Sequence, residues 1–155
     1  MTNPSGWKHR MKFIIVVLTF PTIMILCWNT KADESHLRKS VLPPCPKSPN
    51  CVSSIASSAY KKMDPIKYQS SALDAKRKLL EITRSFKRAT IVQNQGDYVK
   101  VQFRSRIFSF TDDVEFEFDD HSKIINFRSA SRSGYYDLGV NRKRMETISA
   151  KFLLH

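Results

Sequence analysis

The stretches VKVQFR (Val99–Arg104) and VEFEF (Val114–Phe118) decide the fold of this chain of 155 residues. In both, apolar residues alternate with polar ones, which predicts two strands that each have one apolar face and one charged face. On the charged face, we expect Lys100, Arg104 and Arg128 to lie on the side occupied by Glu115 and Glu117, so that opposite charges can pair across neighbouring strands. Much of the basic surplus of the chain is then matched within the sheet.

Turn signals bound these two strands. Asn94–Asp97 precedes the first strand and predicts a hairpin with a strand that begins at Thr90. Asp119–Ser122 follows the second strand and predicts a turn into a further strand, in which Ile125 and Phe127 continue the inward pattern. The sheet is therefore expected to be antiparallel, with about four strands.

Two helices are expected to flank this sheet. Ser71–Asp74 has a hydroxyl followed by an acid three positions later, which is typical of a helix start and predicts a helix over about 72–87. Its apolar stripe consists of Leu73, Leu79, Leu80, Ile82 and Phe86. A second helix is predicted over Arg142–Leu154. Its residues turned toward the sheet are Met145, Ile148, Phe152 and Leu153. The fold class is α+β.

The N-terminus has the layout of a secretory signal, with positive charge before the apolar run Phe13–Trp28 and small residues at the cleavage positions before Asp33. As a helix this run spans roughly 24 Å, which is short of the ~30 Å hydrocarbon core and favours cleavage after Ala32. A snorkelling Lys12 can lengthen the span, so an uncleaved membrane anchor stays open.

We therefore interpret residues 1–32 as a signal peptide or membrane anchor, 33–44 as a linker and 45–155 as one globular domain. The protein is expected to be exported, with its domain in the periplasm or anchored to the cytoplasmic membrane on the outer side.

Charge indicates the kind of partner. The formal net charge is +12, and beyond residue 32 the chain has 22 Lys and Arg against 14 Asp and Glu. Such a balance favours anionic partners such as phospholipid head groups or surface polyanions. No recognition motif accompanies the charge, so we predict no specific binding of nucleic acid.

Cys45 and Cys51 enclose a turn-rich stretch with two prolines. In an oxidising compartment, two cysteines this close favour a disulfide, which stabilises by roughly 2 kcal/mol in the chain-entropy model. Two reduced, packed thiols are the alternative. The spacing does not match a zinc site, and we predict neither a metal nor a cofactor.

The segment Arg128–Arg142 is the candidate functional site, because it combines hydroxyl and guanidinium groups with two of the four glycines in a long connection. Asn141 is a credible N-cap, yet three cations follow it in the first helical turn, where the helix dipole disfavours positive charge. A negative group is expected nearby. It is either internal, from Asp137 or the acids of Asp112–Asp120, or a bound anion. The predicted anion ligands are Arg128, Ser129, Ser131, Arg132, Asn141 and Arg142.

Two other functions remain open. A hydrolase could use Ser129 or Ser131 with Asp137, but the chain has no G-x-S-x-G motif and no triad order, so we assign no catalytic residue. An assembly protein would instead dock to another envelope protein through exposed aromatic residues. These are Tyr135, Tyr136, Phe108 and Phe110.

Four segments carry a family resemblance, and they lie in a fixed order along the chain. They are Cys45-Pro-Lys-Ser-Pro-Asn-Cys51-Val-Ser-Ser, Arg106-Ile-Phe-Ser-Phe-Thr-Asp-Asp-Val-Glu-Phe, Arg128-Ser-Ala-Ser-Arg-Ser-Gly and Asp137-Leu-Gly-Val-Asn-Arg142. Over about Pro44–Phe152 the chain resembles the domain of unknown function 1499 family. The resemblance implies a compact, exported or membrane-associated domain, mostly bacterial, and brings no reaction, cofactor or catalytic residue with it. The expected function is a non-enzymatic binding or interaction module of the cell envelope.

Overall fold

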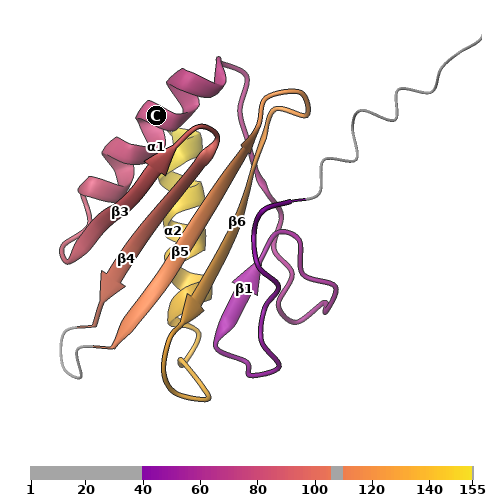
Figure 1. Cartoon of the computed structure of the whole chain (residues 1–155), viewed down its shortest axis with the longest axis vertical. Helices are drawn as coiled ribbons and strands as arrows, with labels where there is room; N and C mark the ends of the chain where they lie inside the picture. The colour runs from indigo at the N-terminus through magenta and orange to yellow at the C-terminus, as the bar shows by residue number, and fades with distance from the viewer. Residues whose placement is uncertain (1–39, 106–109, 155) are drawn as a thin grey trace, which may run out of the picture. The chain divides into compact units, whose positions relative to one another are not determined.

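The computed structural model describes residues 40–105 and 110–154, which belong to one compact unit (Figure 1). The predicted signal peptide or anchor and most of the predicted linker lie outside these residues, as does Phe108. Within the described part of the chain, no helix is both long and apolar enough to cross a membrane.

The sheet has six antiparallel strands in the order β1-β6-β5-β4-β3, with β2 paired to a separate part of β6. Their bounds are β1 Cys51–Ser53, β2 Ile66–Lys67, β3 Ala89–Gln95, β4 Tyr98–Arg104, β5 Thr111–Asp119 and β6 Ile124–Ser131. The prediction of an antiparallel sheet is confirmed, and β3 to β6 are the four expected strands. Strands β1 and β2 were not expected, because two or three residues are too few to show an alternating pattern.

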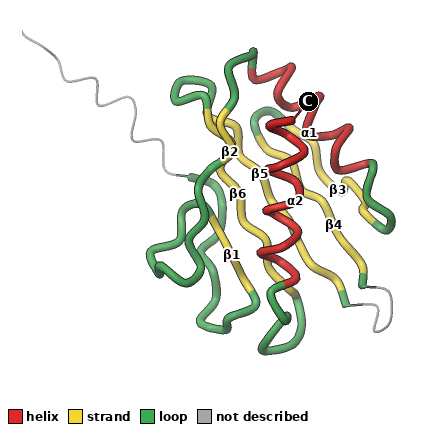
Figure 2. The backbone as a smooth tube through the Cα atoms, turned by 180° about the vertical axis from the view of Figure 1, so that it is seen from behind, coloured by secondary structure: helices red, strands yellow, loops and turns green. Residues whose placement is uncertain are grey.

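The alternation in β4 and β5 separates the two faces of the sheet as predicted. Val99, Phe116 and Phe127 are opposite one another across β4, β5 and β6, and all three are fully buried under the helices. Figure 2 shows both helices on this one face.

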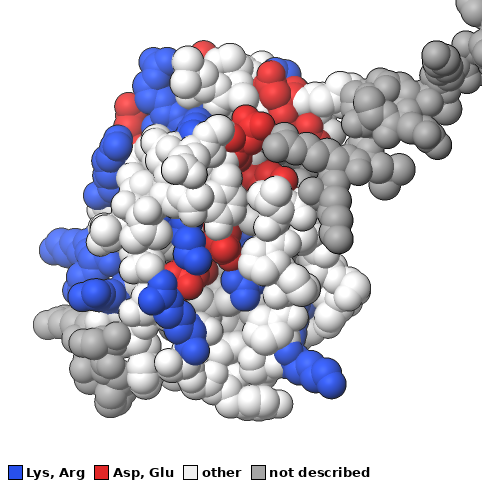
Figure 3. Space-filling view, viewed as in Figure 1, with Lys and Arg blue, Asp and Glu red and all other residues white. Residues whose placement is uncertain are grey.

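Charged residues meet on the face without helices. Glu115 accepts a hydrogen bond of 2.8 Å from Arg128, and its carboxylate lies 3.7 Å from the ammonium group of Lys100. The predicted cross-strand pairing is therefore confirmed for Lys100, Arg128 and Glu115, whereas Arg104 is opposite Thr111 and Glu117 accepts hydrogen bonds from residues 40 and 41. Figure 3 shows basic and acidic side chains together in the middle of this face.

Helix α1 spans Ala72–Arg84, and the hydroxyl of Ser71 accepts a hydrogen bond from the backbone N–H of Asp74, as a capping residue does. The predicted start is confirmed, but the helix ends three residues early. Leu73 was wrongly expected on the buried stripe. It is 70% exposed, because it points about 120° away from the centre of the buried residues that surround Leu79.

Helix α2 spans Val140–Leu154, and Met145, Ile148 and Phe152 face the sheet as predicted. Leu153 was also expected there, but it is 69% exposed. Buried positions in α2 recur at intervals of three and four residues, and Leu153 lies one residue beyond the last of them.

The sheet-packed part of the chain begins before Cys45. Leu42 is buried, and Glu117 on the face without helices accepts hydrogen bonds from the hydroxyl of Ser40 and the backbone N–H of Val41. Residues 40–44, which we predicted as the end of the linker, therefore pack against the domain.

Candidate functional site

Three connections that lie far apart in the sequence meet at one end of the sheet. Strand β1 follows the disulfide loop, and its Cys51 is opposite Ala130, near the end of β6. Strand β5 begins beside the same end, because Asp112 is opposite Ser131. We call this region the loop end and define it as residues 45–50, 110 and 132–143 (Figure 1). The four segments that carry the family resemblance all reach it.

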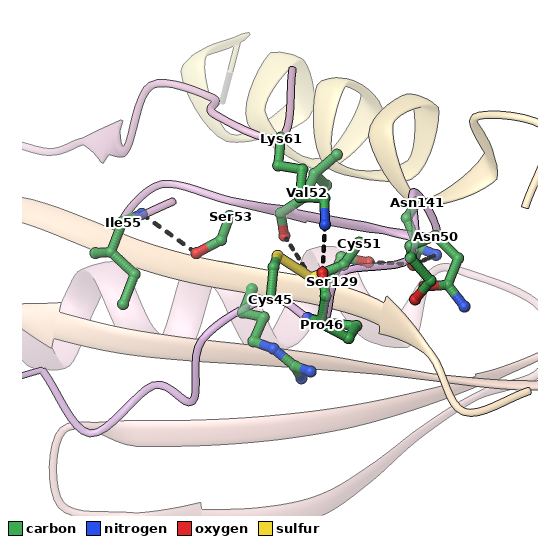
Figure 4. The surroundings of a disulfide bond; sticks show 12 residues. Cys45, Pro46, Asn50, Cys51, Val52, Ser53, Ile55, Lys61, Ser129 and Asn141 are labelled. Carbon is green, nitrogen blue, oxygen red and sulfur yellow. Dashed lines mark hydrogen bonds between the residues drawn. A yellow bond between two sulfur atoms is a disulfide. The ribbon is translucent and has the colours of Figure 1, made fainter. Parts of the chain in front are cut away.

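The disulfide between Cys45 and Cys51 is present, with a Cα–Cα distance of 5.7 Å. Cys51 is buried at the start of β1, while the loop before it turns Asn50 toward the start of α2 (Figure 4). The Asn50 side chain also donates a hydrogen bond of 2.5 Å to the carbonyl of Gly134. The bridge closes the loop that holds Asn50, and the hydrogen bonds of Asn50 tie this loop to the connection between β6 and α2.

Asn141 is the centre of a buried polar network. Its side chain is fully buried, and its amide oxygen accepts a hydrogen bond of 2.6 Å from the hydroxyl of Ser129. Its amide nitrogen lies 3.1 Å from the carbonyl oxygen of Asn50 and 3.0 Å from the hydroxyl of Ser131. This one side chain thus joins the disulfide loop, β6 and α2.

The start of α2 is capped by Asp137 and not, as predicted, by Asn141. The Asp137 carboxylate accepts hydrogen bonds from the backbone N–H groups of Gly139 at 3.1 Å and of Asn141 at 2.9 Å. Asn141 is the second residue of the helix, because Val140 already has helical geometry. An internal negative group therefore lies at the positive end of the helix dipole.

A second internal acid neutralises one of the three cations in the first turn of α2. Arg144 forms a salt bridge of 2.6 Å with Asp112, and both side chains are largely buried. The same guanidinium donates to the amide oxygen of Asn141 at 2.7 Å and lies over the ring of Phe103, 4.6 Å from its centroid. We did not predict Arg144 as a site residue. The sequence indicated this role only through the position of Arg144, three residues after Asn141 and therefore on the same side of a helix.

Arg132 is matched as well. Its guanidinium donates two hydrogen bonds of 2.9 Å to the carboxylate of Asp113. Partial burial acts to raise the pKa of Asp113, but the hydrogen bonds and charge of Arg132, with the charge of Lys100, outweigh it and hold that pKa below its ordinary value. The fork geometry makes this a specific ion pair.

The structure places the six predicted ligands in three different environments. Ser129, Ser131 and Asn141 belong to the polar network, Arg128 lies on the face without helices, and Arg132 and Arg142 point outward. Arg128, Ser129 and Ser131 lie in β6, which continues three residues further than predicted, so the connection to α2 comprises residues 132–139. Arg128 points to the face without helices, opposite to the two serines, because side chains alternate along a strand. Its Nε is buried and has no hydrogen-bond partner within the described residues.

Arg142 points outward from the first turn of α2 and donates a hydrogen bond of 2.5 Å to the carbonyl of Tyr60. Lys143 beside it is exposed. Neither cation forms a salt bridge with a residue of the described ranges.

Large apolar side chains are also exposed at the loop end. They are Phe110, Tyr135, Tyr136, Leu138 and Val140. The exposure that we expected of Phe110, Tyr135 and Tyr136 is therefore observed, whereas Leu138 and Val140 were not singled out in the sequence. A cluster of exposed apolar residues commonly marks an interaction surface.

The hydroxyl of Ser129 is not placed for hydrolysis. Ser129 is fully buried and donates its hydroxyl proton to Asn141, so it lacks both access and a base. His121, the one histidine within the described ranges, lies in the β5–β6 turn at the far end of β6. Across residues 40–105 and 110–154, no group of three or more His, Cys, Asp or Glu is placed to hold a metal ion.

The fold and the loop end define a small α+β domain, with one antiparallel sheet, two helices on one face and a disulfide-linked end. A family model described as protein of unknown function (DUF1499) matches residues 41–152. The chain therefore belongs to this family, as its four segments predicted. No curated protein and no solved structure matches the chain.

Proposed function

We propose that the domain is a non-enzymatic binding module of the cell envelope, which attaches through its loop end to an anionic partner. One observation carries this proposal: Arg142 and Lys143 lack an acidic partner in the described residues, and large apolar side chains are exposed at the same loop end.

The charge balance at the loop end supports an anionic partner. Arg132 and Arg144 are matched by Asp113 and Asp112, and Asp137 is turned toward backbone N–H groups. The outward charge that remains is positive. Its attraction for an anion acts at a distance, so it steers the partner toward this end before contact.

The rigidity of the loop end supports binding. Its backbone is held by the disulfide, by the side chain of Asn141 and by the cap from Asp137. Side chains on such a scaffold lose little conformational entropy when a partner binds, so more of the contact energy appears as affinity.

The predicted N-terminal signal or anchor supports an envelope location. Positive charge before an apolar run is expected to direct the domain out of the cytoplasm. In that compartment the available anions include phospholipid head groups and surface polymers.

Titration of the protein with polyphosphate at low ionic strength tests the proposal. We expect replacement of Arg142 and Lys143 by Ala to weaken binding at least fivefold and to reduce the dependence of the affinity on salt, because two cations leave the contact. Replacement of Lys62 and Lys67 by Ala removes the same charge elsewhere and is the matched control, since both are exposed outside the loop end. Equal effects of the two double substitutions would refute a role for the loop end and leave only general attraction to a basic protein.

A further inference from the structure

Leu138 lies in the turn that brings Asp137 to the start of α2, where the backbone N–H of Val140 donates a hydrogen bond of 3.1 Å to the carbonyl of Asp137. Its φ is 55°, in the left-handed region, where the Cβ of a non-glycine residue crowds the backbone. Its side chain is 82% exposed, so packing within the domain does not compensate for this strain. Glycine or asparagine would adopt the same conformation more easily. The turn accounts for the backbone conformation, whereas the exposure of a large apolar side chain at this place indicates a contact outside the domain.

Two tyrosines accompany this leucine. Tyr135 is 75% exposed and Tyr136 is 56% exposed, so three large side chains project within four residues. We call Tyr135, Tyr136 and Leu138 the tip. Figures 1 and 2 both show the connection between β6 and α2 at the extremity of the domain, beyond the ends of the strands. The tip is therefore a protrusion that can enter another phase.

We propose that the tip inserts into the surface of an anionic lipid bilayer, with Arg142 and Lys143 against the lipid phosphates. This inference rests on the proposed function and names the anionic partner. The side chains of the tip and the two cations suit successive depths of a bilayer surface. Leucine favours the acyl region, tyrosine favours the head-group region and the cations remain with the phosphates.

A bilayer explains the tip better than the alternative partners do. A soluble polyanion would contact the cations and leave the leucine in water. A stable protein partner commonly covers about 800 Å² on each side, which is a large area for three side chains on one loop. In contrast, each apolar side chain that enters a bilayer makes the free energy of binding more favourable.

The charge around the tip permits a close approach to an anionic surface. Asp137 is the one acid of residues 132–143, and its carboxylate is turned toward the backbone of α2. No acidic side chain of this segment therefore faces the bilayer.

Local fluorescence quenching in vesicles that contain phosphatidylglycerol tests the inference on the full chain. Trp7 and Trp28, the two tryptophans, are replaced by Phe so that one new tryptophan reports alone. We expect Tyr136→Trp to be quenched by brominated lipid. Leu73→Trp is the matched control, because Leu73 is 70% exposed at the start of α1, far from the loop end. Its tryptophan should stay unquenched. Equal quenching at both positions, or none at residue 136, would overturn the inference.

The substitution Leu138→Asn tests the contribution of the tip to membrane binding separately from that of the two cations. We expect it to lower the ratio of inserted to free tip roughly tenfold, from the transfer of one leucine side chain, without lowering the melting temperature. Leu73→Asn should leave the ratio unchanged. A tip that stays quenched in Leu138→Asn would overturn the inference.

The outcomes also distinguish the inference from the proposed function. Binding of polyphosphate through Arg142 and Lys143, with no quenching at residue 136, overturns tip insertion and leaves anion binding intact. Loss of both overturns both. Crosslinking of residue 136 to an envelope protein, with no quenching by lipid, overturns the bilayer in favour of a protein partner.

Discussion

Replacement of Asn141 by Ala should destabilise the domain more than any other single polar substitution at the loop end. The side chain is fully buried, and its loss leaves the hydroxyl of Ser129 without an acceptor for its proton. Other partners are less affected. The carbonyl of Asn50 still accepts from the backbone N–H of Ser131, and Arg144 keeps its salt bridge with Asp112.

The magnitude follows from this inventory. The Asn141 side chain takes part in five hydrogen bonds, with Ser129, Asn50, Ser131, Asp137 and Arg144. Because Asn50 and Arg144 keep other partners, two or three hydrogen bonds are lost in net terms at about 1 kcal/mol each, and one buried donor without a partner adds about 1 kcal/mol or more. We expect a loss of about 3 to 4 kcal/mol in the free energy of unfolding. For a domain of this size, that lowers the melting temperature by about 10 to 20 °C.

Urea unfolding followed by circular dichroism measures this change, provided that the slope against denaturant stays constant. Asn94→Ala is the matched control, because Asn94 is exposed in β3 and its loss should change stability by less than about 0.5 kcal/mol. A loss below about 1 kcal/mol in Asn141→Ala would refute the view that this network holds the loop end together. Water that replaced the amide group would be the physical reason.

Two further predictions concern the same end of the sheet. Replacement of Cys45 and Cys51 by Ala should lower the free energy of unfolding by roughly 2 kcal/mol, because a seven-residue loop is no longer closed in the unfolded chain. Guanidinium unfolding with and without reductant measures this loss. A variant as stable as the oxidised protein would contradict the prediction. Asp113 has a lower pKa in the folded state than in the unfolded chain, so its contribution to stability is present above the unfolded pKa and is lost as pH falls through the folded pKa. Asp113→Asn should therefore flatten the decline of the melting temperature below about pH 4. If the melting temperature of Asp113→Asn declined at acid pH as in the parent protein, Arg132 would not be what holds this carboxylate in its charged form.

Local patterns predicted those parts of the candidate site that depend on neighbours in the sequence. The cysteine pair and the cationic first turn of α2 were both recognised in this way. The capping partner was not, because Asp137 and Asn141 are equally suitable by residue type, and only the position of the first helical residue decides between them.

The strand that carries the two serines shows why the rest of the site could not be predicted. Ser129-Ala-Ser131 has the composition of a loop, and no alternation of large apolar residues identifies it as a strand. It is a strand because β1 and β5 lie on either side and provide backbone partners. Those partners come from segments far away in the sequence, so local propensity has no access to them.

By itself, the sequence determined the fold class, the antiparallel strands β3 to β5, the first part of β6 and the start of α1, and it favoured the disulfide. Each of these follows from periodicity or from the spacing of a few residues. Only the tertiary structure decided that Arg132 and Arg144 are matched by Asp113 and Asp112, and that Leu138 is exposed in a left-handed conformation. These features depend on the packing of three connections at one end of the sheet, and contacts between distant segments are not encoded in the local pattern of any one of them.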